Sequence, residues 1–438
     1  MKATVIGGGL AGCEAAWALA ERGVEVTLHE MRPVVKTPAH QTDRLAELVC
    51  SNSFKSTDLT NAHGLLKAEL SDLGSLLLPA AARARVPAGA ALAVDRDVFS
   101  QDVHAQVSAH PRITVVRGER HELASHTVIA TGPLTSTELG EAIAARLGTG
   151  ALAFYDAIAP IVSVDSLDQT VLYALSRYGK GDGDDYLNAP MDKEQYEAFI
   201  DALSAGDQFH GHEFDKVPYF EGCLPVEEMA SRGRETLRFG PMKPVGLPDP
   251  RTGKEPWAVV QLRREDKAAQ MWNLVGFQTR LRIPEQQKVF RSIPGLGNAE
   301  FLRYGSIHRN SYLNSPGALG PGLTAKDDDS LFFAGQLTGV EGYTESLGTG
   351  LMAGINLARK LQGKPVAVPP PTTMLGGLYR YLREADPKHF QPMNANFGLL
   401  EPLDEPPASR GGKIKKDRKK ELLVERARAD FSAWVRAL

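Results

Sequence analysis

The chain of 438 residues has few cysteines and no long apolar run. Its cysteines, Cys13, Cys50 and Cys223, lie far apart and form no CxxC pair. This spacing argues against a cysteine metal site, a redox dithiol and a disulfide framework, and an odd number of free thiols favours a reducing cytoplasm. No apolar run approaches the length of a membrane-spanning helix. Because a strand already begins at Ala3, we expect no cleaved signal peptide.

An excess of charge of one sign is also lacking. The net charge of −3 does not favour nucleic acid as a partner for the surface as a whole, so such a partner would need a local basic patch. The densest basic stretch, residues 410–428, either neutralises several phosphates or is a solvated helix face or mobile tail. Another basic group follows the third cysteine and is better placed to hold a phosphate backbone: Arg232, Arg234 and Arg238.

Residues 3–30 have the pattern of a βαβ unit that binds a dinucleotide. A short apolar strand runs into the turn GGGLAG, a helix follows, and an alternating strand ends at Glu30. The glycines permit a tight turn, close approach of the backbone to a pyrophosphate and close helix–strand packing. The helix N-terminus attracts phosphates, and the terminal carboxylate suits an unphosphorylated ribose. The alternative is a glycine-rich turn without a ligand. The expected cofactor-binding residues are Gly7, Gly8, Gly9, Leu10, Ala11, Gly12 and Glu30.

A second pattern lies near the C-terminus. Residues 331–334 indicate a buried strand that ends in a turn, and a helix rich in small residues follows from Gly348. This pattern resembles the closing segment of FAD-dependent flavoproteins of the two-dinucleotide type, and residues 128–133 resemble their strand-ATG element. The resemblance implies FAD as the resident cofactor. Since there is no second GxGxxG unit, NAD(P)H would visit without a Rossmann domain of its own. Further cofactor-binding candidates are Gly335, Gln336, Tyr343, Gly348 and Gly350.

These patterns predict an α/β fold. We expect a discontinuous Rossmann-type FAD-binding domain with an inserted α+β substrate domain and a helical C-terminal segment. The inserted part is marked by acidic loops and an amphipathic helix near residues 192–203, and prolines after residue 364 form a stiff linker. The expected boundaries are 1–164 for the first part of the FAD domain, 165–282 for the insert, 283–364 for the closing part and 365–438 for the linker and basic helical segment.

Several segments resemble one enzyme family. The Gly-rich opening, LVCSNS at 48–53, EGCLP at 221–225, RYGSIHRN at 303–310 and the closing segment are similar to the folate- and FAD-dependent tRNA (uracil-5-)-methyltransferases. A related family, the tRNA wobble-uridine carboxymethylaminomethyl-modifying flavoproteins, shares the opening and closing segments but is considerably longer. The resemblance implies methylation of uridine 54 in the T-loop of tRNA. Methylenetetrahydrofolate would be the carbon donor, and FAD reduced by NAD(P)H would be the electron donor.

This reaction needs a thiolate, a base and a flavin. The C5 carbon of uracil is a poor nucleophile, but a thiolate that adds at C6 enables C5 to attack a methylene group. The C5 proton must then leave, and a hydride from the reduced flavin converts the methylene into a methyl. By resemblance, Cys223 is the nucleophile. Cys50 follows an apolar, strand-like run at 45–49 and by resemblance either assists removal of the C5 proton or protects the flavin. Free cysteines are often buried packing residues, which is our interpretation of Cys13.

Two other side chains are candidates for contact with flat rings. The resemblance implies that His308 covers one face of the pterin of folate, while a structural hydrogen-bond network is the alternative. Tyr343 either stacks on or caps the flavin, or belongs to the core. No metal-ligand set is recognisable. Two other functions remain open: wobble-uridine modification, which would require a partner GTPase, and reduction of a small molecule by an FAD oxidoreductase.

Overall fold

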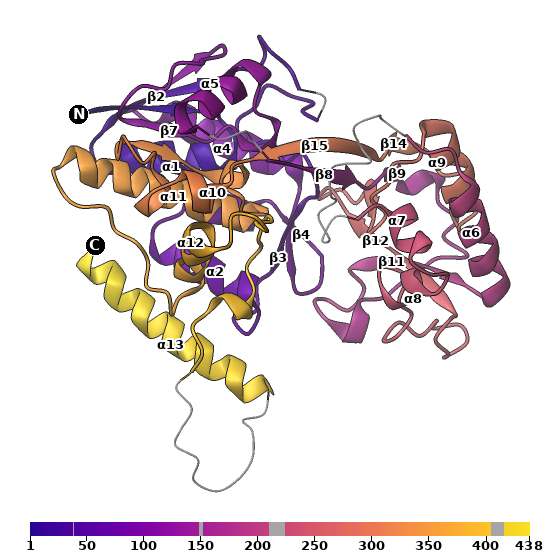
Figure 1. Cartoon of the computed structure of the whole chain (residues 1–438). Coiled ribbons are helices and arrows are strands. Elements are labelled where there is room, and N and C mark those ends of the chain that lie inside the picture. The colour runs from indigo at the N-terminus through magenta and orange to yellow at the C-terminus, as the bar shows by residue number, and fades with distance from the viewer. Residues whose placement is uncertain (38, 149–151, 210–223, 404–415) are drawn as a thin grey trace, which may run out of the picture.

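The structure of the chain is a computed structural model that describes residues 1–37, 39–148, 152–209, 224–403 and 416–438. It has two lobes side by side (Figure 1). The antiparallel strands β8 (Leu152–Ile158) and β15 (Ser306–Tyr312) pair with one another and run between the lobes. The chain therefore crosses from the first lobe to the second on one strand and returns on its neighbour.

The first lobe is built on a parallel sheet whose strands follow the order β16-β7-β1-β2-β6. The N-terminal strand lies inside the sheet, so the turn that follows it opens at the carboxyl edge, where α/β sheets bind their ligands. This arrangement confirms the predicted βαβ opening and parallel α/β sheet. The strands are β1 (Lys2–Ile6), β2 (Glu25–Glu30), β6 (Ile113–Arg117), β7 (Thr127–Ile129) and β16 (Leu331–Phe333).

Helices α1 (Leu10–Glu21) and α11 (Tyr343–Leu361) pack directly against one another in this lobe. A Cβ atom added at Gly350 would lie 2.2 Å from the carbonyl oxygen of Ala11, so the two backbones approach as closely as a glycine allows. The prediction that α11 begins at Gly348 is wrong, because its first turn starts at Tyr343. The remaining helices before the crossover are α2 (Ala62–Asp72), α3 (Leu77–Arg83), α4 (Arg96–Ala109) and α5 (Thr137–Leu147).

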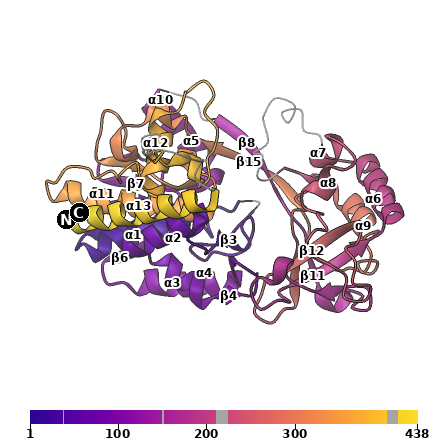
Figure 2. The same ribbon diagram turned by 90° about the horizontal axis from the view of Figure 1, so that it is seen from below.

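A small antiparallel sheet with the order β3-β5-β4 lies on the side of the first lobe that faces the second (Figure 2). Its strands are β3 (Ser53–Ser56), β4 (Arg85–Val86) and β5 (Ala91–Val94). The loop before β3 carries Cys50. This small sheet therefore places that loop between the lobes.

The second lobe is an antiparallel sheet with helices. The strand order is β10-β11-β12-β13-β9-β14, and its buried face forms a separate hydrophobic core. The strands are β9 (Ile161–Ser163), β10 (Tyr173–Ala174), β11 (Tyr186–Met191), β12 (Ala258–Arg264), β13 (Met271–Leu274) and β14 (Phe301–Arg303), and the helices are α6 (Lys193–Ala205), α7 (Val226–Ser231), α8 (Thr236–Phe239) and α9 (Ile283–Phe290).

The structure moves both expected borders of this insert. Val162 on β9 already belongs to the second core, before the expected start at 165. Helix α9 contributes Val289 and Phe290 to the same core, beyond the expected end at 282. The physical reason is strand pairing: β9 pairs with β13 and β14, so segments flanking the insert in sequence complete its sheet.

The C-terminal segment packs on the first lobe and contributes Leu378 and Phe431 to its core. It contains α12 (Met374–Glu384) and α13 (Lys416–Ala437), and the short helix α10 (Ser315–Ala318) precedes it. Figure 2 shows α13 running along the first lobe, where Arg428 pairs with Asp72 of α2 at 2.7 Å. Among the helices of the described residues, none combines the length and apolar character needed to cross a bilayer.

Candidate functional site

The turn after β1 leaves open space above one glycine only. Gly7 adopts a φ of 102°, and a Cβ there would lie 2.6 Å from the carbonyl oxygen of Ala130. A Cβ on Gly12 would lie 1.8 Å from the carbonyl oxygen of Gly7, so helix and turn touch. A Cβ on Gly9 would meet no atom within 4 Å. The turn therefore presents its backbone to an open space at Gly9, as a bound pyrophosphate requires.

Glu30 ends β2 beside this turn. Its Oε2 accepts a hydrogen bond from the Gly8 N–H at 2.9 Å, and its Oε1 accepts from the backbone and Nε of Arg32 at 3.0 and 2.8 Å. Burial raises the pKa of the Glu30 carboxyl, but the Arg32 guanidinium and these N–H donors outweigh burial and leave the pKa below its ordinary value. The carboxylate is thus held ionised, with lone pairs left for ribose hydroxyls.

These groups line an elongated pocket, here called the dinucleotide pocket. It extends from Glu30 past Gly9 and the end of β7 to the first turn of α11. The N–H groups at that turn are free of intrahelical partners and favour an anionic or polar ligand edge. The wall includes Gly9, Glu30, Gly132, Gly335, Gln336 and Tyr343. The open cradle, the acidic end and the helix N-terminus fit a dinucleotide cofactor.

Two predicted cofactor residues lie elsewhere. A Cβ at Gly348 would meet Leu375 at 2.9 Å, and one at Gly350 would meet the Ala11 backbone. Because α11 starts at Tyr343, both glycines fall in its second turn, where they serve helix packing.

A second cavity adjoins the first and is here called the Cys50 pocket. Tyr343 and Gln336 line both cavities, so the two share a wall. Residues of the second lobe close the far side of the Cys50 pocket, and the C-terminal segment contributes Asn394. Its polar wall includes Lys55, Arg263, Asn273, Gln278 and Asn310.

Cys50 stands at the rim of this pocket on an irregular loop. Its N–H donates to the Tyr343 Oη at 3.0 Å, and that hydroxyl donates to the carbonyl of Ser51 at 2.8 Å. The phenol therefore fixes the backbone on both sides of the thiol. The prediction of a strand at 45–49 is wrong, because Ala46 adopts a φ of 53° and its N–H donates to Gly8.

The other cysteines and the predicted folate-binding histidine are only partly described. Cys223, the expected nucleophile, lies outside the described residues. His308 lies on β15 opposite Asp156 of β8, and the structure describes the backbone there but not the side chain. Its near neighbour Asn310 lines the Cys50 pocket, so the strand that carries His308 passes the site. Cys13 is fully buried, and desolvation raises its pKa, as expected of a packing residue.

Two of the three predicted phosphate-binding arginines, Arg234 and Arg238, already bind groups of the chain itself. Arg234 pairs with Glu197 and with Asp201, the latter at 2.6 Å. Arg238 donates to the Trp257 carbonyl at 2.7 Å and stacks on that ring. In the basic C-terminal stretch, Arg426 donates to the Pro402 carbonyl at 2.8 Å, and Arg428 pairs with Asp72. These side chains hold structure together, which a count of basic residues could not foresee.

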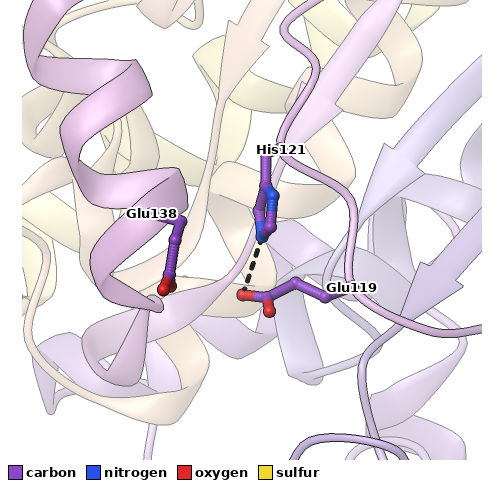
Figure 3. A group of neighbouring side chains, drawn as sticks. All are labelled: Glu119, His121 and Glu138. Atoms are coloured by element: carbon purple, nitrogen blue, oxygen red, sulfur yellow. Dashed lines mark ion pairs between the residues drawn. The ribbon is translucent and has the colours of Figure 1, made fainter.

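One group of side chains near the pocket has the composition of a metal site. Figure 3 shows Glu119, His121 and Glu138 gathered together, with potential ligand atoms all within 4.8 Å of one another. Glu119 Oε1 lies 3.2 Å from His121 Nε2 in an ion pair. His121 and Glu138 are exposed, and exposed acidic groups commonly gather without an ion. We therefore assign no metal to this cluster.

Sequence reasoning missed the residues that hold the Cys50 loop, defined here as residues 48–52. Arg96 and Arg303 donate to its carbonyls, and Arg263 donates to Asn52 at 3.0 Å. Arginines spaced so far from the cysteine carry no local signal. They become recognisable only when β12, β14 and α4 converge on the loop.

Comparisons with known proteins identify the family of this chain. A family model described as glucose inhibited division protein A matches residues 2–365. The methylenetetrahydrofolate–tRNA-(uracil-5-)-methyltransferase TrmFO of Geobacter sulfurreducens is 56% identical over 434 residues, covering 99% of this chain and 98% of the relative. The chain belongs to the TrmFO family. The TrmFO of Anoxybacillus flavithermus is 53% identical over 441 residues and covers all of both chains.

A solved structure places this TrmFO-family chain in a wider fold group. GidA of Aquifex aeolicus superposes with a TM-score of 0.68 at 16% identity, covering 99% of this chain and 73% of GidA. A second crystal form gives a TM-score of 0.66. At this identity the likeness concerns the fold alone. It confirms the α/β fold class with its parallel sheet.

Proposed function

We propose that the chain methylates C5 of uridine 54 in the T-loop of tRNA. Methylenetetrahydrofolate would supply the carbon, and FAD reduced by NAD(P)H would supply the electrons. The observation that carries the proposal is that the dinucleotide pocket and the Cys50 pocket lie side by side and share a wall at Tyr343 and Gln336. A cofactor ring and a pyrimidine could meet there beside a thiol. The TrmFO relatives, similar over their full length, support the same reaction.

The dinucleotide pocket would hold FAD. Glu30 would accept the ribose hydroxyls, the backbone at Gly9 would face the pyrophosphate, and the first turn of α11 would face the ring. When bound and reduced, the flavin supplies the hydride that converts the transferred methylene into a methyl group. Tyr343 would cover the ring edge while its hydroxyl holds the Cys50 loop.

The two cysteines would divide the work on the uracil ring. The Cys223 thiolate would form a bond to C6, and C5 would then attack the methylene, whose bond to the folate nitrogen breaks. As the Cys50 thiolate takes the C5 proton, the electron pair would break the methylene's second bond to folate. Once the hydride has been added to the methylene, the C6–sulfur bond would break and its electron pair would return to Cys223. Cys50 lines the pocket that would receive the uracil ring. This position supports proton removal by Cys50 over a role that only protects the flavin.

The polar wall offers positive charge to an anionic substrate, beside one carboxylate, that of Glu341. Lys55 and Arg263 bring positive charge to the Cys50 pocket, where either an RNA phosphate or a folate carboxylate could pair with them. A uridine in a folded T-loop would have to leave its stack to reach this cavity. The amides of Asn273 and Gln278 provide donors and acceptors for the edge of a base.

A substrate with fluorine at C5 tests the two cysteine roles separately. Because fluorine cannot leave as a proton, a C6 adduct on tRNA containing 5-fluorouridine would persist and shift the protein on a denaturing gel. We expect the adduct with the wild type and with Cys50→Ala, and none with Cys223→Ala. An adduct that survives in Cys223→Ala would refute the assigned nucleophile.

A further inference from the structure

Together with the Tyr343 hydroxyl, one partly buried guanidinium holds the backbone of the Cys50 loop. Arg96, at the start of α4, donates through Nη1 to the Leu48 carbonyl at 2.7 Å and through Nη2 to the Cys50 carbonyl at 2.8 Å. Arg303 adds a bond to the intervening Val49 carbonyl at 3.0 Å. Bidentate donation of this kind fixes orientation as well as distance. The orientation of the Cys50 thiol therefore depends on the position of the Arg96 side chain.

Arg96 is itself held from the second lobe. Its Nε lies 2.7 Å from Oε2 of Glu265, which follows β12 and has a side chain only 1% exposed. Burial lowers the pKa of Arg96, but the Glu265 carboxylate outweighs burial and leaves the pKa raised. A buried pair of this kind is costly to break, because either partner alone is an uncompensated charge.

The Arg96–Glu265 pair joins the two lobes beside the Cys50 loop. Asn52 donates to the Arg264 carbonyl at 2.9 Å, directly before Glu265, and accepts from Arg263 at 3.0 Å. A second contact nearby avoids the loop: Lys267 donates to the Arg83 carbonyl at 2.8 Å. The end of β12 thus makes two kinds of contact with the first lobe, one through the Cys50 loop and one beside it.

We propose that Arg96 and Glu265 form a positioning pair that orients the Cys50 thiol toward its pocket only while the second lobe is docked. Neither side chain is among the residues that line the dinucleotide pocket or the Cys50 pocket, so the pair would act through the loop backbone. The role of Cys50 in methylation rests on the proposed function. The anchoring of the loop by the pair is independent of that function and can be measured separately.

The test compares Arg96→Lys and Glu265→Gln with the control Lys267→Ala. We expect Arg96→Lys to lower kcat about 10- to 100-fold with KM for tRNA unchanged, because a small misplacement of a reacting atom has that effect. Glu265→Gln keeps a hydrogen-bond acceptor but loses the negative charge. Its kcat should lie between those of Arg96→Lys and the wild type. Lys267→Ala removes a contact between the lobes without touching the loop, so it should retain wild-type kcat.

A second readout does not depend on catalysis. In a Cys223→Ser background, the alkylation of Cys50 by iodoacetamide is followed by peptide mass spectrometry, with the fully buried Cys13 as internal reference. Loss of the anchor should raise the Cys50 alkylation rate several-fold in Arg96→Lys and not in Lys267→Ala. An unchanged rate in Arg96→Lys, or an equal rise in Lys267→Ala, would overturn the proposal. If the wild type forms no methyluridine, the proposed function fails. The alkylation rates still show whether Arg96 and Glu265 anchor the Cys50 loop.

Discussion

At the scale of single residues, the glycines of the first lobe separate into two kinds. Gly9 has an ordinary extended conformation and open space around it, whereas Gly350 is pressed against the Ala11 backbone. Both were expected to serve the cofactor. Only the space around a missing Cβ distinguishes a glycine that faces a ligand from one that lets two helices meet.

This distinction predicts opposite behaviour for two alanine substitutions. Gly9→Ala should leave the free energy of unfolding of the cofactor-free protein unchanged but lower flavin binding at least about tenfold, which is about 1.4 kcal/mol. Gly350→Ala should reduce the free energy of unfolding by about 1–3 kcal/mol through overpacking. Urea unfolding and the flavin content of the purified protein measure both. Normal flavin binding by Gly9→Ala would contradict the assigned geometry.

His40 on the wall of the dinucleotide pocket makes stability depend on pH. Burial, and then the nearby Arg32 cation, lower its pKa from 6.5 to about 4, against opposing effects of Glu47 and Glu30. Between these values the unfolded chain binds a proton that the folded chain does not. Stability should therefore fall as pH drops from 6.5 to 4, by at most about 1.4 kcal/mol per pH unit from this group.

The substitution His40→Gln removes this titration and provides the control. Unfolding in urea at several pH values should show a shallower loss of stability in the variant than in the wild type. Equal slopes would mean that the buried imidazole accepts its proton as readily as an exposed one.

At the scale of elements, one buried carboxylate caps the first helix of the C-terminal segment. Glu69 on α2 is fully buried, and its two oxygens accept the Met374 and Leu375 N–H groups at the start of α12, each at 2.8 Å. These donors have no intrahelical partner. The cap therefore comes from an element some three hundred residues away in the chain, which no local pattern reveals.

Removing this cap should loosen the C-terminal segment. Glu69→Ala should lower the free energy of unfolding by about 2–4 kcal/mol, because two buried N–H groups lose their acceptor. Trypsin should also cut residues 365–438 faster. The matched control is Glu21→Ala, since Glu21 forms an exposed pair with His110 and should have little effect. Similar behaviour of the two variants would refute the capping role.

Local sequence patterns predicted some of the helices and strands and misplaced others. The βαβ opening, the strand at 331–333 and the helix at 193–205 were predictable, because glycines, alternation and apolar period are local signals. The predicted start of α11 was too late, because the sequence of Tyr343, Thr344 and Glu345 resembles a polar turn. The helix begins there because Gly342, with a φ of 113°, caps it. The borders of the insert were displaced because β9 and β14 pair across more than a hundred residues.

At the scale of the whole molecule, the candidate site is a property of two lobes together. The first lobe alone accounts for the dinucleotide pocket, whose residues follow recognisable turns. The Cys50 pocket also needs Arg263 and Asn273 of the second lobe, and its loop is anchored by Glu265. Such contacts depend on how the lobes dock, so the sequence predicted the cysteine through family resemblance and could not predict its surroundings.

The central claim is that a thiol, a folate methylene and a flavin act together on a tRNA uracil. Its most direct test is nucleoside mass spectrometry of unmodified tRNA after incubation with the protein, methylenetetrahydrofolate and NAD(P)H. The account predicts new 5-methyluridine at position 54, absent when Cys223→Ala or a tRNA lacking that uridine is used. Reduction and reoxidation of the flavin without any gain of methyl would contradict it.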